Sequence, residues 1–212
     1  TITFVGKLNT SKGYDIFGAA VLKILKKYKD WKANVIGDEL REKITFKHKN
    51  LKILGFLKHK EVLKIFNKTS IAVACSRWEE PFGRTSLEAS SRGCSVIISN
   101  RGGLPETITN GIILKKLSHL ELYKAIEQLI KNKKKRQELQ KLSINNFYLT
   151  HKFVSNKIDK YRDIIAGNKI SIFNLKKNKR LKILHVTNFN ERHNGRLFYN
   201  TGRRLNNGLI KL

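Results

Sequence analysis

Acidic side chains are scarce in this sequence, where 16 Asp and Glu stand against 44 Lys and Arg and the net charge is +28 at pH 7. Such an excess is typical of proteins that bind nucleic acid or anionic membranes. The basic residues, however, are scattered along the whole chain, and no RNA- or DNA-binding motif accompanies the aromatics. We therefore expect no nucleic-acid partner and a weak contact with an anionic membrane, and we keep a basic nucleic-acid-binding module as the less favoured alternative.

Cysteine is nearly absent as well. The two that occur, Cys75 and Cys94, both lie in apolar runs, which predicts small buried residues in a protein of a reducing compartment. No window approaches the roughly 20 apolar residues of a membrane-spanning helix, and no signal peptide is visible. We expect a cytoplasmic protein, peripheral to the inner face of the membrane if its basic surface binds there.

Methionine is missing altogether, also at the first position, and the chain opens directly on a strand-like run at residues 1–5. Both features indicate a fragment of a longer protein, so we expect a domain that precedes this one. The 40% of apolar residues is enough for a folded core.

What the sequence does contain, over residues 1–166, is a regular alternation of short apolar runs and amphipathic segments. Strands are predicted at residues 2–5, 32–36, 51–54, 71–75, 94–99 and 111–114. Helices are predicted at 14–27, 59–67, 85–92, 117–132, 134–149 and 153–165, with a short helix and an edge segment after residue 38. Strands that are apolar throughout and separated by helices predict an α/β fold, a Rossmann-like parallel sheet with helices on both faces.

Ligands of such sheets bind beyond the carboxyl ends of the strands. The loops expected at that end are 6–13, 55–57, 76–84 and 100–104. In the first, Lys7 and Lys12 flank a glycine-containing helix start, which is a candidate clamp for a diphosphate. In the third, Pro81 and Gly83 form a turn, and a helix that starts near Gly83 would direct free N–H groups beyond the strand.

Two carboxylates, Glu80 and Glu88, bracket that turn. A carboxylate is a good partner for a sugar hydroxyl, and bare helix amides are good partners for a phosphate. Taken alone, the two glutamates favour a solvated helix start, which their charge would stabilise.

The wider pattern resembles a known family. The spacing Glu80-x7-Glu88, with Pro-Phe-Gly between them, resembles the E-x7-E signature of retaining glycosyltransferases of the GT-B fold, in particular the group often called family 4. Residues 92–97 (RGCSVI) and 102–106 (GGLPE) match the next landmarks of that family in order and spacing, and loop 6–13 resembles its G-R/K-L-x-x-x-K-G loop. The resemblance implies the C-terminal, donor-binding half of a GT-B fold.

What the resemblance implies chemically is transfer of a sugar from a nucleotide diphosphate, UDP or GDP, to a hydroxyl of an acceptor glycan or lipid-linked sugar, with retention at the anomeric carbon. The process would be the synthesis of cell-surface glycan or polysaccharide. Glu80 and Lys12 are the implied catalytic residues. The implied nucleotide-sugar-binding residues are Gly6, Lys7, Lys12, Phe56, Leu57, Phe82, Gly83, Arg84, Thr85 and Glu88.

The chain contains no D-x-D pair, so we expect a metal-independent reaction without a cofactor. The acceptor site of this architecture belongs to the preceding domain, and we expect the fragment to bind the donor but to transfer little or nothing alone. A nucleotide-sugar-binding domain that lacks catalysis is the alternative.

The end of the chain changes character. Residues 167–179 are polar and lysine-rich and are predicted to form a linker. Residues 180–188 then read as a fresh strand that leads into a helix-like segment at 196–205. This stretch, 180–212, resembles the first βα unit of a second GT-B N-terminal domain.

Overall fold

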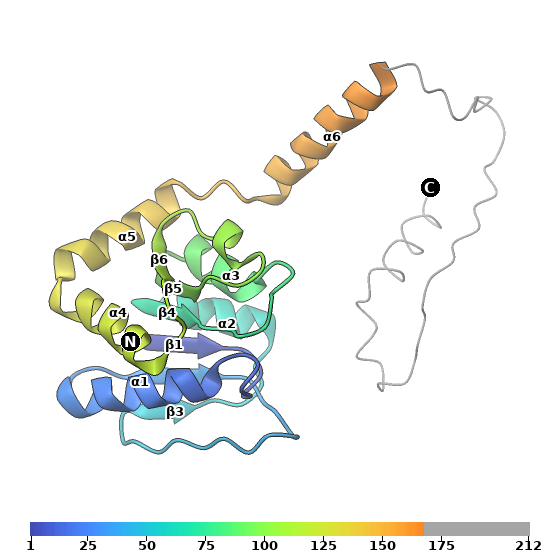
Figure 1. The fold of residues 1–212 in the computed structure, drawn as a ribbon. Coiled ribbons are helices and arrows are strands. Elements are labelled where there is room, and N and C mark those ends of the chain that lie inside the picture. Colours follow the sequence, from blue (N-terminus) through green and yellow to red (C-terminus); the bar gives the residue numbers. More distant parts are fainter. Residues whose placement is uncertain (168–212) are drawn as a thin grey trace. The chain divides into compact units, whose positions relative to one another are not determined.

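The computed structural model describes residues 1–167, of which residues 1–160 form one compact unit. Its centre is a six-stranded sheet (Figure 1) in which every neighbouring pair of strands is parallel. The strands are β1 (Ile2–Val5), β2 (Ala33–Ile36), β3 (Leu51–Ile53), β4 (Ile71–Ala74), β5 (Ser95–Ser99) and β6 (Gly111–Leu114).

The strand order is β3-β2-β1-β4-β5-β6. The chain therefore builds outward from β1 to one edge, crosses back to β4, and builds outward to the other edge. Doubly wound sheets bind their ligands where the winding reverses, which here is between the carboxyl ends of β1 and β4. The predicted α/β class and parallel sheet are confirmed.

Helices cover both faces of the sheet. On one face α1 (Tyr14–Lys27) and α4 (His119–Lys131) pack over a core that includes Phe4, Val73 and Ile97. On the other face α2 (His59–Phe66) and α3 (Arg84–Ser91) pack over Val96 and Ile98. Successive residues of β5, such as Ile97 and Ile98, thus serve opposite cores, which is why the middle of this strand is apolar and does not alternate with polar residues.

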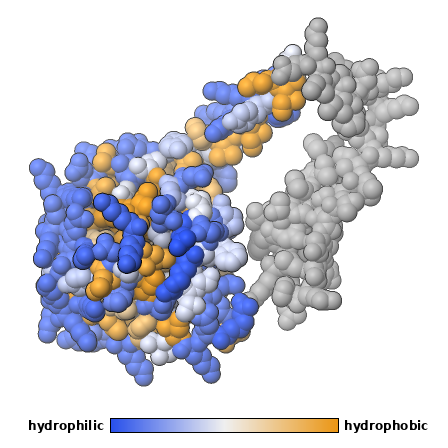
Figure 2. Space-filling view, in the orientation of Figure 1, coloured by the Kyte–Doolittle hydropathy of each residue, from blue (hydrophilic) through white to orange (hydrophobic). Residues whose placement is uncertain are grey.

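Three further helical segments complete the described chain. The 3-10 helix η1 (Leu104–Thr107) follows β5, and α5 (Lys133–Asn145) contacts α3, α4 and β5. The last element is α6 (His151–Gly167), all of whose residues are exposed. Hydrophilic residues cover most of the face seen in Figure 2, as the composition leads one to expect. None of the helices in residues 1–167 combines the length and the apolar content needed to cross a bilayer.

The predicted strands and long helices form within a few residues of their predicted ends, but the short helix expected after residue 38 is wrong. Residues 38–50 form an irregular segment. Its side chains are held by neighbours elsewhere: Glu42 accepts a hydrogen bond from the Thr10 backbone N–H, and Phe46 packs edge-on against Tyr14 of α1. These tertiary contacts outweigh a local helical preference. The predicted βα unit at 180–212, and the predicted linker beyond Gly167, lie outside the described residues.

A cluster of hydrogen bonds around Glu127 joins α1 to α4. Its Oε1 accepts from Lys27 Nζ at 2.8 Å, from the Tyr28 hydroxyl at 2.9 Å and from the Tyr123 hydroxyl at 2.7 Å. These donors, the Lys27 ammonium first, lower the pKa of the Glu127 carboxyl to about 2. The folded state therefore favours the ionised carboxylate more strongly than the unfolded chain does.

We predict that Glu127→Gln lowers the melting temperature by a few degrees at pH 7, because the charge that binds Lys27 is lost. A lowered folded-state pKa stabilises the protein above the unfolded value, near 4.5, and this contribution is lost as the pH falls toward 2. The difference from wild type should thus be smaller at pH 3 than at pH 7. Thermal melts followed by circular dichroism test this. Glu121→Gln, on the same helix and paired with Lys124 at the surface, is the control, and an equal effect of both changes at pH 7 would contradict the prediction.

Candidate active site

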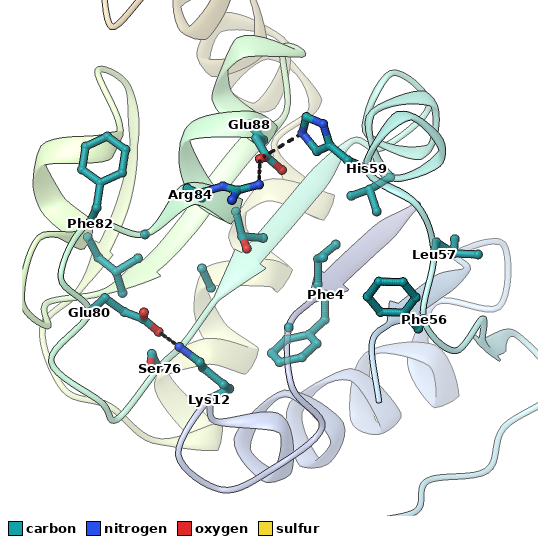
Figure 3. A pocket seen from close by; sticks show the side chains of 17 residues that line it. Phe4, Lys12, Phe56, Leu57, His59, Ser76, Glu80, Phe82, Arg84 and Glu88 are labelled. Atoms are coloured by element: carbon teal, nitrogen blue, oxygen red, sulfur yellow. Dashed lines mark hydrogen bonds and ion pairs between the residues drawn. The ribbon is translucent and has the colours of Figure 1, made fainter. Parts of the chain in front are cut away.

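A cleft of about 580 Å³ opens at the carboxyl ends of β1 and β4, where the winding of the sheet reverses (Figure 3). It receives residues from the loops after β1, β3, β4 and β5 and from the first turns of α2 and α3. The lining residues are Phe4, Val5, Gly6, Lys12, Phe56, Leu57, His59, Val62, Ala74, Ser76, Glu80, Phe82, Gly83, Arg84, Thr85, Glu88 and Leu104.

The start of α3 forms one wall. Gly83 is its N-cap residue and has a left-handed backbone (φ 79°, ψ 56°), and no side chain caps the N–H groups of this helix. A Cβ at Gly83 would lie 2.6 Å from Leu104 Cδ2, so glycine also permits the close contact with η1. The buried Ser86 hydroxyl bonds to the Gly83 carbonyl and to the Thr107 hydroxyl of η1, which fixes the helix start. The uncapped first turn presents its amides and the positive end of the helix dipole to the cleft.

The glutamate turn, residues 79–83, rests on the loop that follows β5. The Gly103 N–H donates to the Glu80 carbonyl at 2.7 Å, and the Gly102 N–H and Arg101 Nη1 donate to the Glu79 carboxylate. The bond from Arg101 is the main reason that the pKa of Glu79 is lowered. Gly102 has φ +51°, and a Cβ there would lie 2.3 Å from the Glu80 carbonyl oxygen. The backbone of the turn therefore touches the 102–103 backbone directly.

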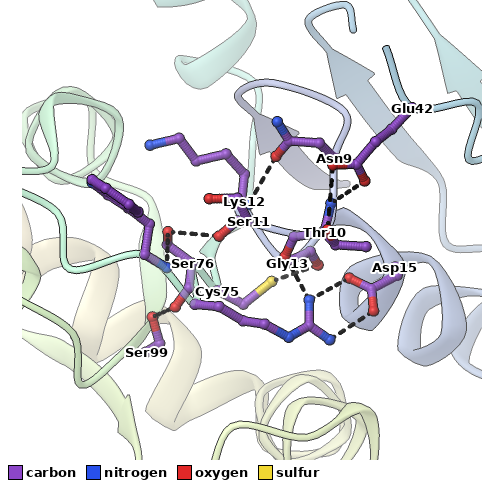
Figure 4. A network of polar contacts seen from close by, with 12 residues as sticks. Asn9, Thr10, Ser11, Lys12, Gly13, Asp15, Glu42, Cys75, Ser76 and Ser99 are labelled. Atoms are coloured by element: carbon purple, nitrogen blue, oxygen red, sulfur yellow. Dashed lines mark hydrogen bonds and ion pairs between the residues drawn. The ribbon is translucent and has the colours of Figure 1, made fainter.

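The loop that carries Lys12 is attached to the end of β4 (Figure 4). Ser11 accepts hydrogen bonds at its carbonyl from the Arg77 N–H at 2.9 Å and from the Ser76 hydroxyl at 3.1 Å. The Arg77 guanidinium binds the Asp15 carboxylate through two hydrogen bonds of 2.6 and 2.7 Å, and these bonds are the main cause of the lowered pKa of Asp15. A Cβ at Gly13 would lie 1.9 Å from the Cys75 carbonyl oxygen, so only glycine allows this approach.

Lys12 and Glu80 meet across the cleft. Lys12 Nζ donates to Glu80 Oε1 at 2.5 Å, and the two side chains are 31% and 14% exposed. In Figure 3 they point toward one another from different loops. A cation and a carboxylate thus lie in the same cleft as the uncapped start of α3.

Glu88 lies in a separate part of the cleft. Its Oε1 contacts His59 Nε2 at 3.1 Å and Arg84 Nη2 at 3.4 Å. Its side chain is 19% exposed. Figure 3 shows that this group and the Lys12–Glu80 pair occupy different positions around the same space.

Of the residues predicted for the site, all except Lys7 line the cleft. Lys7 is exposed and is not among the lining residues, and its predicted role stays a prediction. The structure adds Phe4, Val5, His59, Val62, Ala74, Ser76 and Leu104. Val5, Ala74 and Ser76 follow from the predicted strand ends and could have been found there. His59 could not, because its partner comes from another helix and no local pattern marks that contact.

In the described part of the chain, residues 1–167, no group of three or more His, Cys, Asp and Glu side chains is arranged to hold a metal ion. Positive charge in the cleft comes from Lys12, Arg84 and the helix amides.

Comparison with known proteins assigns the chain to a family. The model of the family described as "Glycosyl transferases group 1" matches residues 1–145. The chain belongs to the group 1 glycosyltransferases. The residues of this glycosyltransferase that line the cleft, from Phe4 to Leu104, all fall inside the matched region.

Curated relatives of this group 1 glycosyltransferase are longer. It is 30% identical over 159 residues to spore coat protein SA of Bacillus subtilis (strain 168), a match that covers 67% of this chain and 42% of that protein. It is 35% identical over 114 residues to an uncharacterized 41.2 kDa protein in the cps region of Klebsiella pneumoniae, covering 52% of this chain and 30% of that one. The chain therefore spans less than half the length of these relatives.

Solved structures also match this chain over a single domain or over part of a longer chain. The C-terminal domain of the glycosyl transferase group 1 family protein LpcC from Francisella tularensis superposes with a TM-score of 0.62 at 28% identity, covering 68% of this chain and 82% of that domain. HepE of Anabaena, solved in complex with UDP and glucose, gives a TM-score of 0.62 at 18% identity, covering 78% of this chain and 48% of that one. The latter likeness shows the shared fold.

The contact between Gly102 and the glutamate turn predicts an unequal effect of two similar substitutions. Gly93 and Gly102 both have positive φ, but a Cβ at Gly93 meets the movable Ile144 side chain, whereas one at Gly102 meets the Glu80 backbone. We expect Gly93→Ala to cost about 1 kcal/mol and Gly102→Ala about 2–4 kcal/mol, since backbone cannot move aside as a side chain can. Urea unfolding of both variants measures the costs, and equal losses would show that the turn does not rest on Gly102 as described.

Proposed function

We propose that this chain is the donor-binding half of a retaining glycosyltransferase, which transfers a sugar from UDP or GDP to an acceptor hydroxyl. The observation that carries the proposal is the arrangement of one cleft: a paired lysine and glutamate at an uncapped helix start, and a second glutamate deeper along the same helix. Each element of a nucleotide sugar has a chemically suitable partner there.

The roles follow from charge and position. The diphosphate would bind Lys12 and the backbone amides of Phe82, Gly83 and Arg84, which combine a cation with a helix N-terminus. As the bond between the anomeric carbon and the diphosphate oxygen breaks, negative charge grows on the leaving group, and these fixed donors stabilise it. The proposed mechanism places the stabilising charge on the protein and expects no metal ion, so chelating agents should not affect donor binding.

The ribose hydroxyls would bind Glu88, whose carboxylate stays open to the cleft. Phe56 and Leu57 would border the base. Glu80 would accept hydrogen bonds from the donor sugar, because it lies beside Lys12, the proposed partner of the diphosphate to which the sugar is joined.

Donor binding would require an exchange of partners. In the free protein Lys12 is bound to Glu80. A diphosphate carries more negative charge than a carboxylate and would draw Lys12 away, which leaves the Glu80 oxygens to accept from the sugar. In the free protein the ion pair would thus give each of these two partly buried charges a partner. In the complex the diphosphate would become the partner of Lys12, and the sugar that of Glu80.

The rest of the enzyme would supply the acceptor. Because the chain covers 42% and 30% of the two relatives described above, we place the acceptor site, for a glycan or a lipid-linked sugar, in the part of the enzyme that this chain does not include. HepE of Anabaena, a protein of the same fold, was solved with UDP, and this makes UDP the first nucleotide to try.

The test is calorimetric titration of the chain with UDP, GDP and ADP. We expect one of them to bind, and Glu88→Ala to weaken that binding about tenfold or more, since hydrogen bonds to a charged group contribute about 1.5–3 kcal/mol. Glu121→Ala, a surface change on α4, is the control and should leave affinity unchanged. If none of the three binds, the proposed donor site is wrong. If polyanions of every kind bind with a steep salt dependence, a nucleic-acid-binding module becomes the better interpretation.

A second prediction tests the exchange of partners. Glu80→Gln should leave UDP binding unchanged or tighten it a few fold, because no ion pair between Lys12 and Glu80 then has to be broken before Lys12 can bind the diphosphate. The same change should remove most of the extra affinity of UDP-sugar over UDP. Lys12→Met should instead weaken both ligands about tenfold or more, as loss of a charged phosphate contact would. Titration of each variant with UDP and with UDP-glucose distinguishes these effects. If Glu80→Gln weakened the binding of UDP and of UDP-glucose equally, the proposed contact between Glu80 and the sugar would be contradicted.

A further inference from the structure

We propose that His59 is a positioning residue for Glu88, and that it sets the selectivity of the cleft for ribonucleotides over nucleotides that lack a ribose hydroxyl. The inference rests on the proposed function, since it concerns how the same cleft recognises the ribose. It assigns a role to a residue that the sequence motifs do not include.

The two carboxylate oxygens of Glu88 differ in their contacts. His59 Nε2 and Arg84 Nη2 both approach Oε1, at 3.1 and 3.4 Å. Among the hydrogen bonds of the described residues none reaches Oε2, although Glu88 lines the cleft. One carboxylate oxygen is therefore held by the protein, and the other is available to a ligand.

His59 is the better placed of the two holders. It is the first residue of α2 and reaches Glu88 from a different element (Figure 3), whereas Arg84 lies one turn before Glu88 on the same helix. The Arg84 side chain is 75% exposed and its contact is the longer one, and exposed pairs of this spacing contribute only about 0.3–0.5 kcal/mol. The His59 side chain is 55% exposed, less than that of Arg84. It also has fewer rotatable bonds than arginine, so less side-chain entropy is lost when it holds the carboxylate.

The contact does not depend on one protonation state of the histidine. Nε2–H is present in one neutral tautomer and in the imidazolium, and either can donate to Oε1. The Lys58 backbone N–H donates to Glu61 Oε2 at 2.9 Å within the first turn of α2, so this neighbouring carboxylate is directed to the helix start.

A carboxylate held in one orientation discriminates more strongly than a mobile one. Where a site is built to accept a hydroxyl, a ligand without that hydroxyl leaves a desolvated acceptor unpaired and is rejected. If Glu88 can turn away, toward Arg84 or solvent, the unpaired oxygen finds another partner and the penalty falls. Removal of His59 should thus reduce selectivity for the ribose more than it reduces general affinity for a diphosphate.

The experiment compares UDP with 2′-deoxy-UDP and 3′-deoxy-UDP, or the same forms of whichever nucleoside diphosphate binds, in calorimetric titrations of the full chain. In wild type we expect at least one deoxy form to bind about tenfold or more weakly than the parent. His59→Leu should bring that ratio to about twofold and weaken UDP about fivefold. His59→Gln, which retains a side-chain N–H donor, should restore at least half of the selectivity on a logarithmic scale.

Two controls separate positioning from general damage. His119→Leu changes a histidine at the equivalent place on α4, the first residue of that helix, outside the cleft, and should match wild type. In a Glu88→Ala background, His59→Leu should have no further effect on the ratio, because the residue it positions is gone. If His59→Leu fails to fold, His59→Asn, whose amide is too short to reach Oε1, replaces it.

The outcomes distinguish this inference from the function on which it rests. No binding of any nucleoside diphosphate to wild type would overturn the proposed donor site itself. Binding by wild type with an unchanged ratio in His59→Leu would overturn the role of His59 and leave the donor site intact. Wild-type binding without any preference for the ribose hydroxyls would overturn the role of His59 as well.

Discussion

The parallel pairing of β1 with β4 is the constraint on which the cleft depends. Ile2, Thr3 and Phe4 lie beside Ile71, Ala72 and Val73, and from this register the two strands end at one edge of the sheet. The loop with Lys12 and the turn with Glu80 are 68 residues apart in sequence, yet they leave neighbouring strands at that edge. The close approach of Gly13 to Cys75 and the Arg77–Asp15 bonds then hold the two loops against each other.

Charge is used sparingly in this arrangement. The chain has only 16 acidic residues against 44 basic ones, and a notable share of the acidic ones hold or line the cleft loops. These are Asp15, Glu39, Glu42, Glu79, Glu80 and Glu88. Four of them organise backbone or loops through directed hydrogen bonds, and Glu80 and Glu88 face the cleft itself. In the structure Glu80 is paired with Lys12 and Glu88 with His59, and the net positive charge of the chain would attract an anionic ligand to the cleft under the proposed function.

The fold explains why residues 1–160 form a compact unit. Residues 1–160 have cores on both faces of the sheet, and the cleft lies at the edge where the strands end and borders both cores through Phe4, Val62 and Leu104. The group 1 relatives carry additional chain that this sequence lacks. The cleft is built from the loops of one sheet and is complete within residues 4–104, so it does not need that additional chain to form.

The sequence by itself determined the elements and most of the cleft. Apolar runs such as 71–75 and 94–99 predict buried strands because a strand covered on both faces must be apolar at every position. The glycines and the ordered glutamates mark the turns, since only a few residue types suit a left-handed backbone or an uncapped helix start. Together with the resemblance to the glycosyltransferase family, these patterns name residues that all line the cleft, with the exception of Lys7.

Only the tertiary structure decided which side chains meet. The short helix expected after residue 38 is replaced by an irregular segment because Glu42 and Phe46 find partners on loop 6–13 and α1. The Lys12–Glu80 pair and the His59–Glu88 contact join residues from different elements. Local patterns report which backbone a segment prefers, but the distance between two side chains depends on strand order, register and packing, and these are properties of the whole sheet.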